Sequence, residues 1–148
     1  MIIGIGNDHV GVELKEHIKK YLEDKGHTVK DFGAYTPERT DYPIYRKAVA
    51  DAVISGECEY GVLICGTGVG ISLAANKVKG IRAVVCSEPY TARLCRQHNN
   101  ANIIAFGARV IGPATAEKIV DEFFSATYEG ERHQKRLDLI KKIEDGEM

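Results

Sequence analysis

The chain of 148 residues contains no apolar run that approaches the roughly 20 residues needed to cross a bilayer. Its start has no basic segment followed by a long apolar one, so no secretory signal is expected and the protein is predicted to be cytoplasmic. Neither sign of charge is in excess, because 20 Lys and Arg residues stand against 21 Asp and Glu residues, for a formal net charge of -1. A chain without a positive field is not typical of nucleic-acid binders, so neither nucleic acid nor a membrane is expected as a partner.

Cysteine is scarce as well. Cys58, Cys65, Cys86 and Cys95 form no C-x-x-C pair, and no pair of histidines stands beside them at zinc-finger spacing. In a chain that is not exported they should stay reduced, which excludes a disulfide scaffold. Cys58, Cys86 and Cys95 are interpreted as small buried hydrophobic residues. Cys65 differs because a glycine-rich segment follows it directly.

The composition is that of a globular domain, with 44% hydrophobic and 28% charged residues. A chain of this length can bury a core without disulfides or metals. The sequence shows no linker, low-complexity segment or internal repeat, so residues 1–148 are predicted to form a single domain.

Short apolar runs alternate five times with helical patterns. The runs are continuous, which is typical of strands buried on both faces of a parallel sheet. The sequence therefore predicts an α/β fold, namely a three-layer, doubly wound (Rossmann-like), five-stranded parallel sheet with an extra C-terminal helix. We expect Leu137, Ile140 and Ile143 to face inward from that helix. Strands are expected at 2–5, 28–32, 62–65, 81–86 and 102–106, and the later helices at 69–77, 88–97, from 113, and at 131–144.

Ligands of such folds bind beyond the carboxyl ends of the strands. The segment after the third predicted strand reads Cys65-Gly66-Thr67-Gly68-Val69-Gly70. Its glycines let the backbone approach a ligand closely, and its N–H groups can converge on an oxyanion or a phosphate. It matches neither the dinucleotide fingerprint, since residue 71 is Ile71, nor a P-loop. Cys65 stands at a strand end near a helix N-terminus, which favours the thiolate, so it is either a base or nucleophile or a core cysteine.

Polar residues follow other strands and helices. Asp8 and His9 come after the first strand, where Asp8 can cap the following helix and His9 can bind an anion. His98 and Asn99 begin a polar cluster before the fifth strand, which alternatively is a solvated turn. Arg109 lies between glycines after that strand.

Arg132 and Arg136 lie four residues apart and therefore on one face of the last predicted helix. Two neighbouring guanidinium groups repel unless an anion joins them, and arginine is well suited to phosphate. The alternative is a solvated helix face. His133 lies between the two arginines and is expected to be exposed.

Together these segments resemble the type B ribose-5-phosphate isomerases, within a wider family that includes galactose-6-phosphate isomerase subunits. The resemblance covers nearly the whole chain, and its specificity lies in the order and spacing of the segments. Asn100 departs from many members, which carry Asp there, but no chemistry is assigned to it. The matching segments are 8–11, 38–43, 65–70, 74–77, 80–83, 98–99, 107–112, 128–130, 132–133 and 136.

The resemblance implies interconversion of ribose 5-phosphate and ribulose 5-phosphate through a cis-enediolate, without metal or cofactor, in the non-oxidative pentose phosphate pathway. Cys65 matches the base of the cysteine-type members. Other members carry a Glu at the position of Ile71, and isoleucine cannot take a proton. By the same resemblance, the backbone N–H groups of residues 66–70 hold the enediolate oxygens.

The other roles also rest on the resemblance. His98 protonates the ring oxygen and Thr67 assists at the anomeric hydroxyl, while Asp8 and Asn99 bind sugar hydroxyls. The residues that resemble a phosphate clamp are His9, Arg109, Arg132 and Arg136.

The family's members are dimers or pairs of dimers whose sites are built from two chains, which implies a homodimer or a tetramer with shared sites. Two alternatives stay open. One is an isomerase of a six-carbon sugar phosphate such as allose 6-phosphate, and the other is a non-catalytic sugar-phosphate sensor on the same fold.

Overall fold

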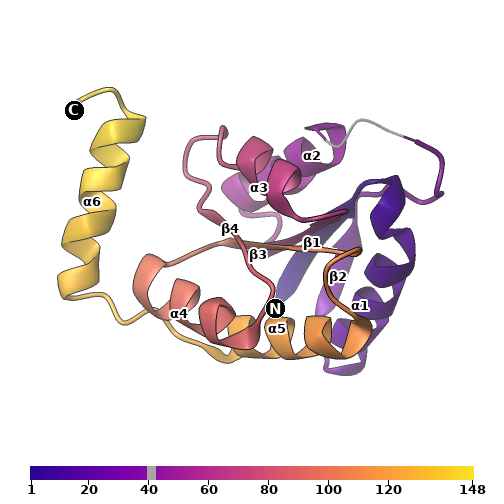
Figure 1. Ribbon diagram of the computed structural model, residues 1–148. Helices are drawn as coiled ribbons and strands as arrows, with labels where there is room; N and C mark the ends of the chain where they lie inside the picture. Colours follow the sequence, from indigo (N-terminus) through magenta and orange to yellow (C-terminus); the bar gives the residue numbers. More distant parts are fainter. Residues whose placement is uncertain (40–42) are drawn as a thin grey trace.

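A computed structural model describes residues 1–39 and 43–148 (Figure 1). Its centre is a five-stranded sheet in which all paired strands are parallel. The order is β2-β1-β3-β5-β4, so the predicted doubly wound parallel sheet is confirmed. Residues 40–42, which belong to one of the segments that carry the resemblance, lie outside the described residues. The strands are β1 (Ile2–Asn7), β2 (Thr28–Asp31), β3 (Tyr60–Cys65), β4 (Ala83–Val85) and β5 (Ile103–Gly107).

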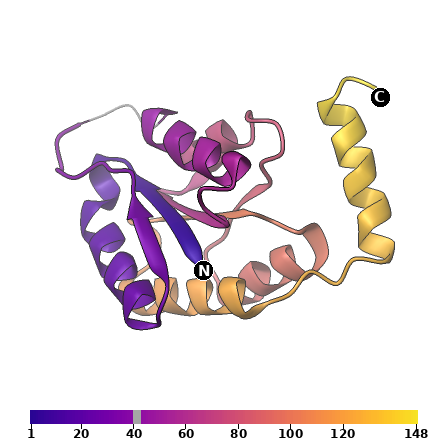
Figure 2. The ribbon, with the colours of Figure 1, turned by 180° about the vertical axis from the view of Figure 1, so that it is seen from behind.

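The helices cover both faces of the sheet (Figures 1 and 2). Side chains of α1, α4 and α5 share one hydrophobic core with the sheet, and α2 and α3 share the other. None of the helices in the described part of the chain has the length and apolar character of a membrane span. The helices are η1 (His9–Gly11, a single 3-10 turn), α1 (Val12–Asp24), α2 (Pro43–Ser55), α3 (Val69–Ala75), α4 (Pro89–Asn99), α5 (Pro113–Ser125) and α6 (Arg132–Glu144).

Burial of both strand faces explains the continuous apolar runs. In β5, Ile104 and Phe106 enter the core with α1, α4 and α5, while Ile103 and Ala105 enter the core with α2 and α3. All four of these side chains are fully buried. The tightly packed sheet therefore holds the loops at its edges in fixed positions.

Three of the cysteines are buried and free, as predicted. Burial raises the pKa of the Cys86 thiol to about 12 and that of Cys95 to about 11. Burial also raises the pKa of Cys58. Because thiolate is the reactive form, these three side chains serve packing rather than redox chemistry.

The fourth helix ends later than predicted. It runs to Asn99 rather than to residue 97, because Asn100 takes the left-handed conformation with φ of 49° and closes it. His98 and Asn99 therefore lie in the last turn of α4 instead of in a loop. Asn102 is tied to the neighbouring turn, since its side chain accepts from the Arg82 N–H and donates to the Gly80 carbonyl.

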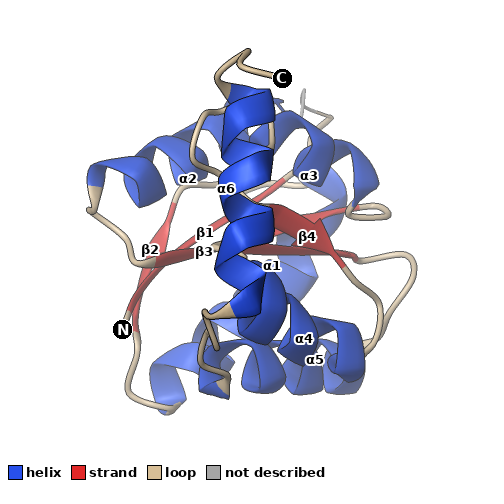
Figure 3. Cartoon of the chain, turned by 90° about the vertical axis from the view of Figure 1, so that its left-hand side faces the viewer, coloured by secondary structure: helices blue, strands red, loops and turns tan. Residues whose placement is uncertain are grey.

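The last helix departs from the prediction in its packing. Leu137 is buried, but Ile140 and Ile143 are 50% and 61% exposed, so the expectation that all three face inward is wrong for the latter two. The physical reason is that α6 stands away from the sheet (Figures 1 and 2), and it crosses in front of the sheet when the molecule is seen from that side (Figure 3). A groove of about 910 Å³ lies between α6 and the edge of the sheet at β4. The far end of α6 is fastened by the Glu144 carboxylate, which accepts from the Gly80 N–H at 2.8 Å.

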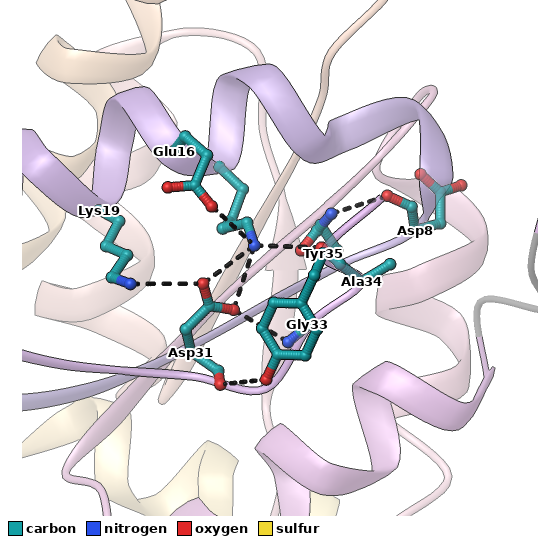
Figure 4. A network of polar contacts seen from close by, with 9 residues as sticks. Asp8, Glu16, Lys19, Asp31, Gly33, Ala34 and Tyr35 are labelled. Carbon is teal, nitrogen blue, oxygen red and sulfur yellow. Dashed lines mark hydrogen bonds and ion pairs between the residues drawn. The ribbon is translucent and has the colours of Figure 1, made fainter. Parts of the chain in front are cut away.

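A buried lysine supports the turn that follows β2. Lys15 of α1 is fully buried, and its ammonium donates to both carboxylate oxygens of Asp31, at 2.9 and 3.2 Å, and to the Ala34 carbonyl. Asp31 also accepts from the Gly33 N–H, and the Tyr35 hydroxyl donates to the Asp31 carbonyl (Figure 4). The network thus joins α1, β2 and the turn at residues 33–35.

Replacing Asp31 with Ala should lower the free energy of unfolding by about 3–5 kcal/mol, because it leaves the Lys15 charge buried beside fewer partners. Urea denaturation measures the change. The matched control is Asp24→Ala, which removes an exposed i,i+4 pair with Lys20 and should change stability by no more than about 0.5 kcal/mol. Similar losses of stability in the two variants would contradict the conclusion that the buried pair of Lys15 and Asp31 stabilises the fold more than an exposed pair does.

Candidate active site

The sheet reverses its winding between β1 and β3, because the chain leaves β1 toward β2 on one side and builds the rest of the sheet on the other. Crevices at such switch points, beyond the carboxyl ends of the strands, are where ligands of doubly wound folds bind. Asp8 and Cys65 flank this crevice. The two chain segments meet there, since the Asp8 N–H donates to the Ile64 carbonyl at 3.0 Å.

Asp8 acts as a helix cap in this structure. One oxygen of its nearly buried carboxylate accepts from the N–H groups of Val10 and Gly11, at 2.9 and 3.2 Å. Capping is one of the roles that the sequence allows for Asp8, and both of these bonds go to the same carboxylate oxygen, Oδ1. His9 follows at the start of η1 and is half-buried.

The glycine-rich loop folds around Cys65. This residue ends β3, and its side chain is 6% exposed. The Gly68 N–H donates to the Cys65 Sγ at 3.1 Å, and the Val69 N–H donates to the Thr67 Oγ1 at 3.2 Å. A backbone N–H aimed at the sulfur stabilises negative charge on it. Ile71 is fully buried in the core, so the thiol is the group of the loop that suits proton transfer.

Two glycines allow the loop to lie directly on β5. Gly68 has φ of 82°, and a Cβ there would stand 2.8 Å from the Phe106 backbone. A Cβ on Gly107 would stand 2.5 Å from the Thr67 Cα and 2.6 Å from the Gly66 carbonyl oxygen. The contact is therefore backbone against backbone, which fixes the height of the loop above the sheet.

Arg109 lies on the same side of the molecule. Its N–H donates to the Gly66 carbonyl at 3.0 Å, and the Ala108 N–H donates to the Cys65 carbonyl at 2.8 Å. The Arg109 side chain is exposed and passes beside Gly66. The carboxyl edge of the sheet thus gathers Asp8, His9, the 65–70 loop and Arg109.

His98 and Asn99 lie at the opposite edge. Gly61 of β3 pairs with Ile103, the first residue of β5, whereas Cys65 pairs with Gly107, the last one. Four residues of strand span about 13 Å, so Cys65 and the end of α4 that carries His98 lie at opposite ends of a strand of that length within one chain. In Figure 1, β5 runs from left to right, with the end of α4 at the left.

The last helix begins beside His98. The Glu129 N–H donates to the Gln97 carbonyl at 2.9 Å, and the ring of His133 stacks on that of His98 with centroids 4.4 Å apart. His133 is 5% exposed, so the expectation that it is exposed is wrong. Its burial follows from this stacking. Arg132 and Arg136 are exposed on the same helix.

The site residues predicted from the sequence therefore form two groups within one chain. One lies at the carboxyl edge of the sheet, and the other lies at the opposite edge. Three residues that support these groups received no role from the sequence, namely Lys15, Glu129 and His133, although the last two lie in segments that carry the resemblance. Lys15 and His133 were hidden because a polar residue on a helix normally faces solvent. Helical periodicity gives no signal for Glu129 either, because it lies in the segment before α6, which begins at Arg132.

Comparisons with known proteins agree on one family. A sequence model described as Ribose/Galactose Isomerase matches residues 3–140. The chain is 57% identical to ribose-5-phosphate isomerase B of Escherichia coli (strain K12) over 142 residues, which are 96% of this chain and 95% of that protein. It is 48% identical to the galactose-6-phosphate isomerase subunit LacB of Clostridium acetobutylicum over 145 residues, which are 98% of this chain and 83% of that protein.

A solved structure gives the same result. The ribose-5-phosphate isomerase B of Clostridium thermocellum superposes with a TM-score of 0.98 at 51% identity, and the match covers 100% of both chains.

Replacing Gly107 with Ala should lower the free energy of unfolding by about 1–3 kcal/mol, because the new methyl group meets loop backbone that has no room to yield. The matched control is Gly112→Ala in the same segment, where a Cβ meets nothing within 4 Å and φ is -90°. Chemical denaturation measures both variants. Equal stabilities would show that the loop is not packed on β5 as closely as described.

Proposed function

The chain belongs to the ribose/galactose isomerase family, and we propose that it interconverts ribose 5-phosphate and ribulose 5-phosphate in the non-oxidative pentose phosphate pathway. The observation that carries the proposal is the thiol of Cys65, which lies at the sheet's switch point with the Gly68 N–H on its sulfur. A proton-transfer enzyme needs one base at this kind of position, within reach of two adjacent carbons. A metal or an organic cofactor is not part of the proposed reaction.

In the proposed reaction, the Cys65 thiolate takes the proton from C2 of the open-chain aldose. The electron pair moves onto the C1 oxygen and leaves a cis-enediolate. The same thiol then returns the proton to C1, while the proton of the C2 hydroxyl passes to the C1 oxygen, so that the C2 oxygen becomes the carbonyl of the ketose and the C1 oxygen its hydroxyl. Atoms and electrons balance without an oxidant, since the reaction moves two hydrogens within one molecule.

The negative oxygens of the enediolate need hydrogen-bond donors. We assign them to the backbone of residues 66–70, which faces the crevice beside Cys65. The Gly68 N–H supports the sulfur, and the Val69 N–H is held by Thr67 until a ligand arrives. Thr67 is exposed at the mouth of the crevice, where its hydroxyl can reach the anomeric hydroxyl of the sugar.

Ring opening sets a geometric condition that points to a second chain. The acid that protonates the ring oxygen must lie within hydrogen-bond reach of an atom bonded to C1. The proposed acid, His98, lies at the opposite edge of the sheet from Cys65 in the same chain, across a strand about 13 Å long. The two groups can act on one sugar only if His98 comes from a partner copy. We therefore propose a homodimer with shared sites, alone or paired into a tetramer.

The last helix supports the same assembly. It carries Arg132 and Arg136, and also the exposed Ile140 and Ile143, which belong to neither hydrophobic core of the described residues. Docking of a second copy against α6 would cover these apolar side chains and carry the arginines to the partner's crevice. In this arrangement His9 and Arg109 meet Arg132 and Arg136 around the phosphate, and Asp8 and Asn99 meet at the sugar hydroxyls.

The second candidate substrate differs from the first in the number of carbons in the sugar. The chain is 48% identical to a subunit of a galactose-6-phosphate isomerase, so six-carbon sugar phosphates such as allose 6-phosphate are the second candidate substrates. A sensor without turnover would need no base at Cys65. Initial rates on five- and six-carbon aldose phosphates separate these candidates.

Replacing Cys65 with Ala should lower kcat for ribose 5-phosphate by at least about a hundredfold, because it removes the base and leaves substrate binding in place. The Ser variant should be similarly slow, since an alcohol is a far weaker acid than a thiol. Cys58→Ala is the matched control and should keep normal turnover. Rapid turnover by the Ala variant would refute the assignment of Cys65 as the base.

Shared sites predict complementation between two inactive variants. Mixing Cys65→Ala with His98→Asn, after dissociation and reassembly, should restore up to about a quarter of wild-type activity, because half of randomly formed dimers are mixed and each carries one intact site. Each variant reassembled alone is the control. Activity that stays at the level of the separate variants would contradict a site built from two chains.

A further inference from the structure

A cluster at the start of α6 surrounds His98, the acid assigned to ring opening. The rings of His98 and His133 are stacked, with centroids 4.4 Å apart and planes 15° from parallel. The Glu129 Oε1 lies 3.7 Å from the His98 Nε2 and 3.6 Å from the His133 Nε2. One carboxylate oxygen thus faces the edges of both rings.

The backbone holds the two supporting residues in place. The Glu129 N–H donates to the Gln97 carbonyl, which fastens residue 129 to the last turn of α4 next to His98. The His133 N–H donates to the Gly130 carbonyl, which sets His133 in the first turn of α6. The stack therefore joins two helices whose relative placement also positions Arg132.

His133 is suited to a supporting role. Its side chain is nearly buried, and its Nε2 makes no hydrogen bond among the described residues. Burial, followed by the nearby Arg132 charge, lowers the pKa of His133. A neutral ring stacks against His98 without the repulsion that two stacked cations would feel.

The three groups also have the composition of a zinc site, but their geometry does not suit one. The lone pair of an imidazole nitrogen lies in the plane of its ring. Two nearly parallel stacked rings do not direct their nitrogens at one ion about 2.1 Å from each. The arrangement suits a support for one ring by another.

We propose that Glu129 and His133 are positioning residues for His98, with His133 fixing the plane of its ring and Glu129 fixing which ring edge faces the sugar. This inference rests on the proposed function, because it assigns the two residues to the ring-opening step of the same reaction. A general acid works only when its proton is aimed at the accepting atom. An imidazole on a half-buried side chain at a helix end would otherwise rotate among several orientations.

Measuring the reaction from each of its two substrates distinguishes a positioning role for Glu129 and His133 from a general loss of structure. Ribose 5-phosphate is a closed ring and needs opening before Cys65 can act. Ribulose 5-phosphate carries its phosphate on the oxygen that would close a ring onto C2, so it is open already. Uptake of deuterium at its C1 in D2O, followed by NMR, therefore reports on Cys65 and on dimer assembly without ring opening.

The variants Glu129→Ala and His133→Ala should lower kcat for ribose 5-phosphate by at least about tenfold, as fits the loss of part of a general-acid contribution. Their rates of C1 deuterium uptake should stay within about twofold of wild type. His98→Asn should give the same pattern in a stronger form. His133→Phe keeps a flat ring on the stack and should recover most of the turnover lost in His133→Ala.

Lys135→Ala is the matched control, because Lys135 is exposed on α6 and belongs to none of the proposed machinery. It should leave both readouts unchanged. Equal loss of turnover and of deuterium uptake in the Glu129 and His133 variants would overturn the positioning role, and so would normal turnover in both. Failure of the proposed function itself is distinguishable, because the wild-type protein would then show neither turnover nor exchange.

Discussion

The site is governed by the parallel pairing of β3 with β5. In a parallel sheet every connecting helix must return the chain to the edge from which the next strand starts. Residues that follow a strand and residues that end a helix are therefore separated by the length of a strand. Cys65 is the last residue of β3 and His98 lies in the last turn of α4, so the register of the sheet keeps the proposed base and the proposed acid apart in one chain. No side-chain rearrangement within the chain removes this separation, whereas a second copy with its opposite edge turned toward the crevice, as proposed, would.

The same sheet makes the glycine-rich loop rigid. Gly68 and Gly107 let the loop settle on the backbone of β5, and the Gly68 N–H is then aimed at the Cys65 sulfur. Below the crevice, Lys15 and Asp31 fasten the turn after β2, whose Gly33 and Ala34 exchange backbone hydrogen bonds with Asn7 beside Asp8. The crevice is thus bounded by groups whose positions are fixed by the backbone, which is the kind of preorganisation that favours a charged intermediate.

Much of this could be predicted from the sequence, and the exceptions share a cause. Continuous apolar strands predict a parallel sheet, and that pattern depends only on local burial. The exposure of Ile140 and Ile143 could not be predicted, because an apolar helix stripe does not reveal whether its cover is the same chain or another one. The burial of Lys15 and His133 depends on partners 16 and 35 residues away, Asp31 and His98, and no local pattern contains that information. Residues that only support others were the ones that sequence reasoning missed.

In the proposed dimer, α6 contributes both to the interface between the two copies and to the active site. Burying a side chain such as Ile140 or Ile143 contributes about 1.5–3 kcal/mol, so covering this face favours association. The same helix carries Arg132 and Arg136 and, through the stack of His133 on His98, is fastened to the proposed acid. Docking of α6 would therefore deliver the phosphate-binding charges and the ring-opening group in one step. A net charge of -1 would conceal this arrangement, because the proposed cationic groups of the clamp are dispersed within one chain and would meet only across the proposed interface.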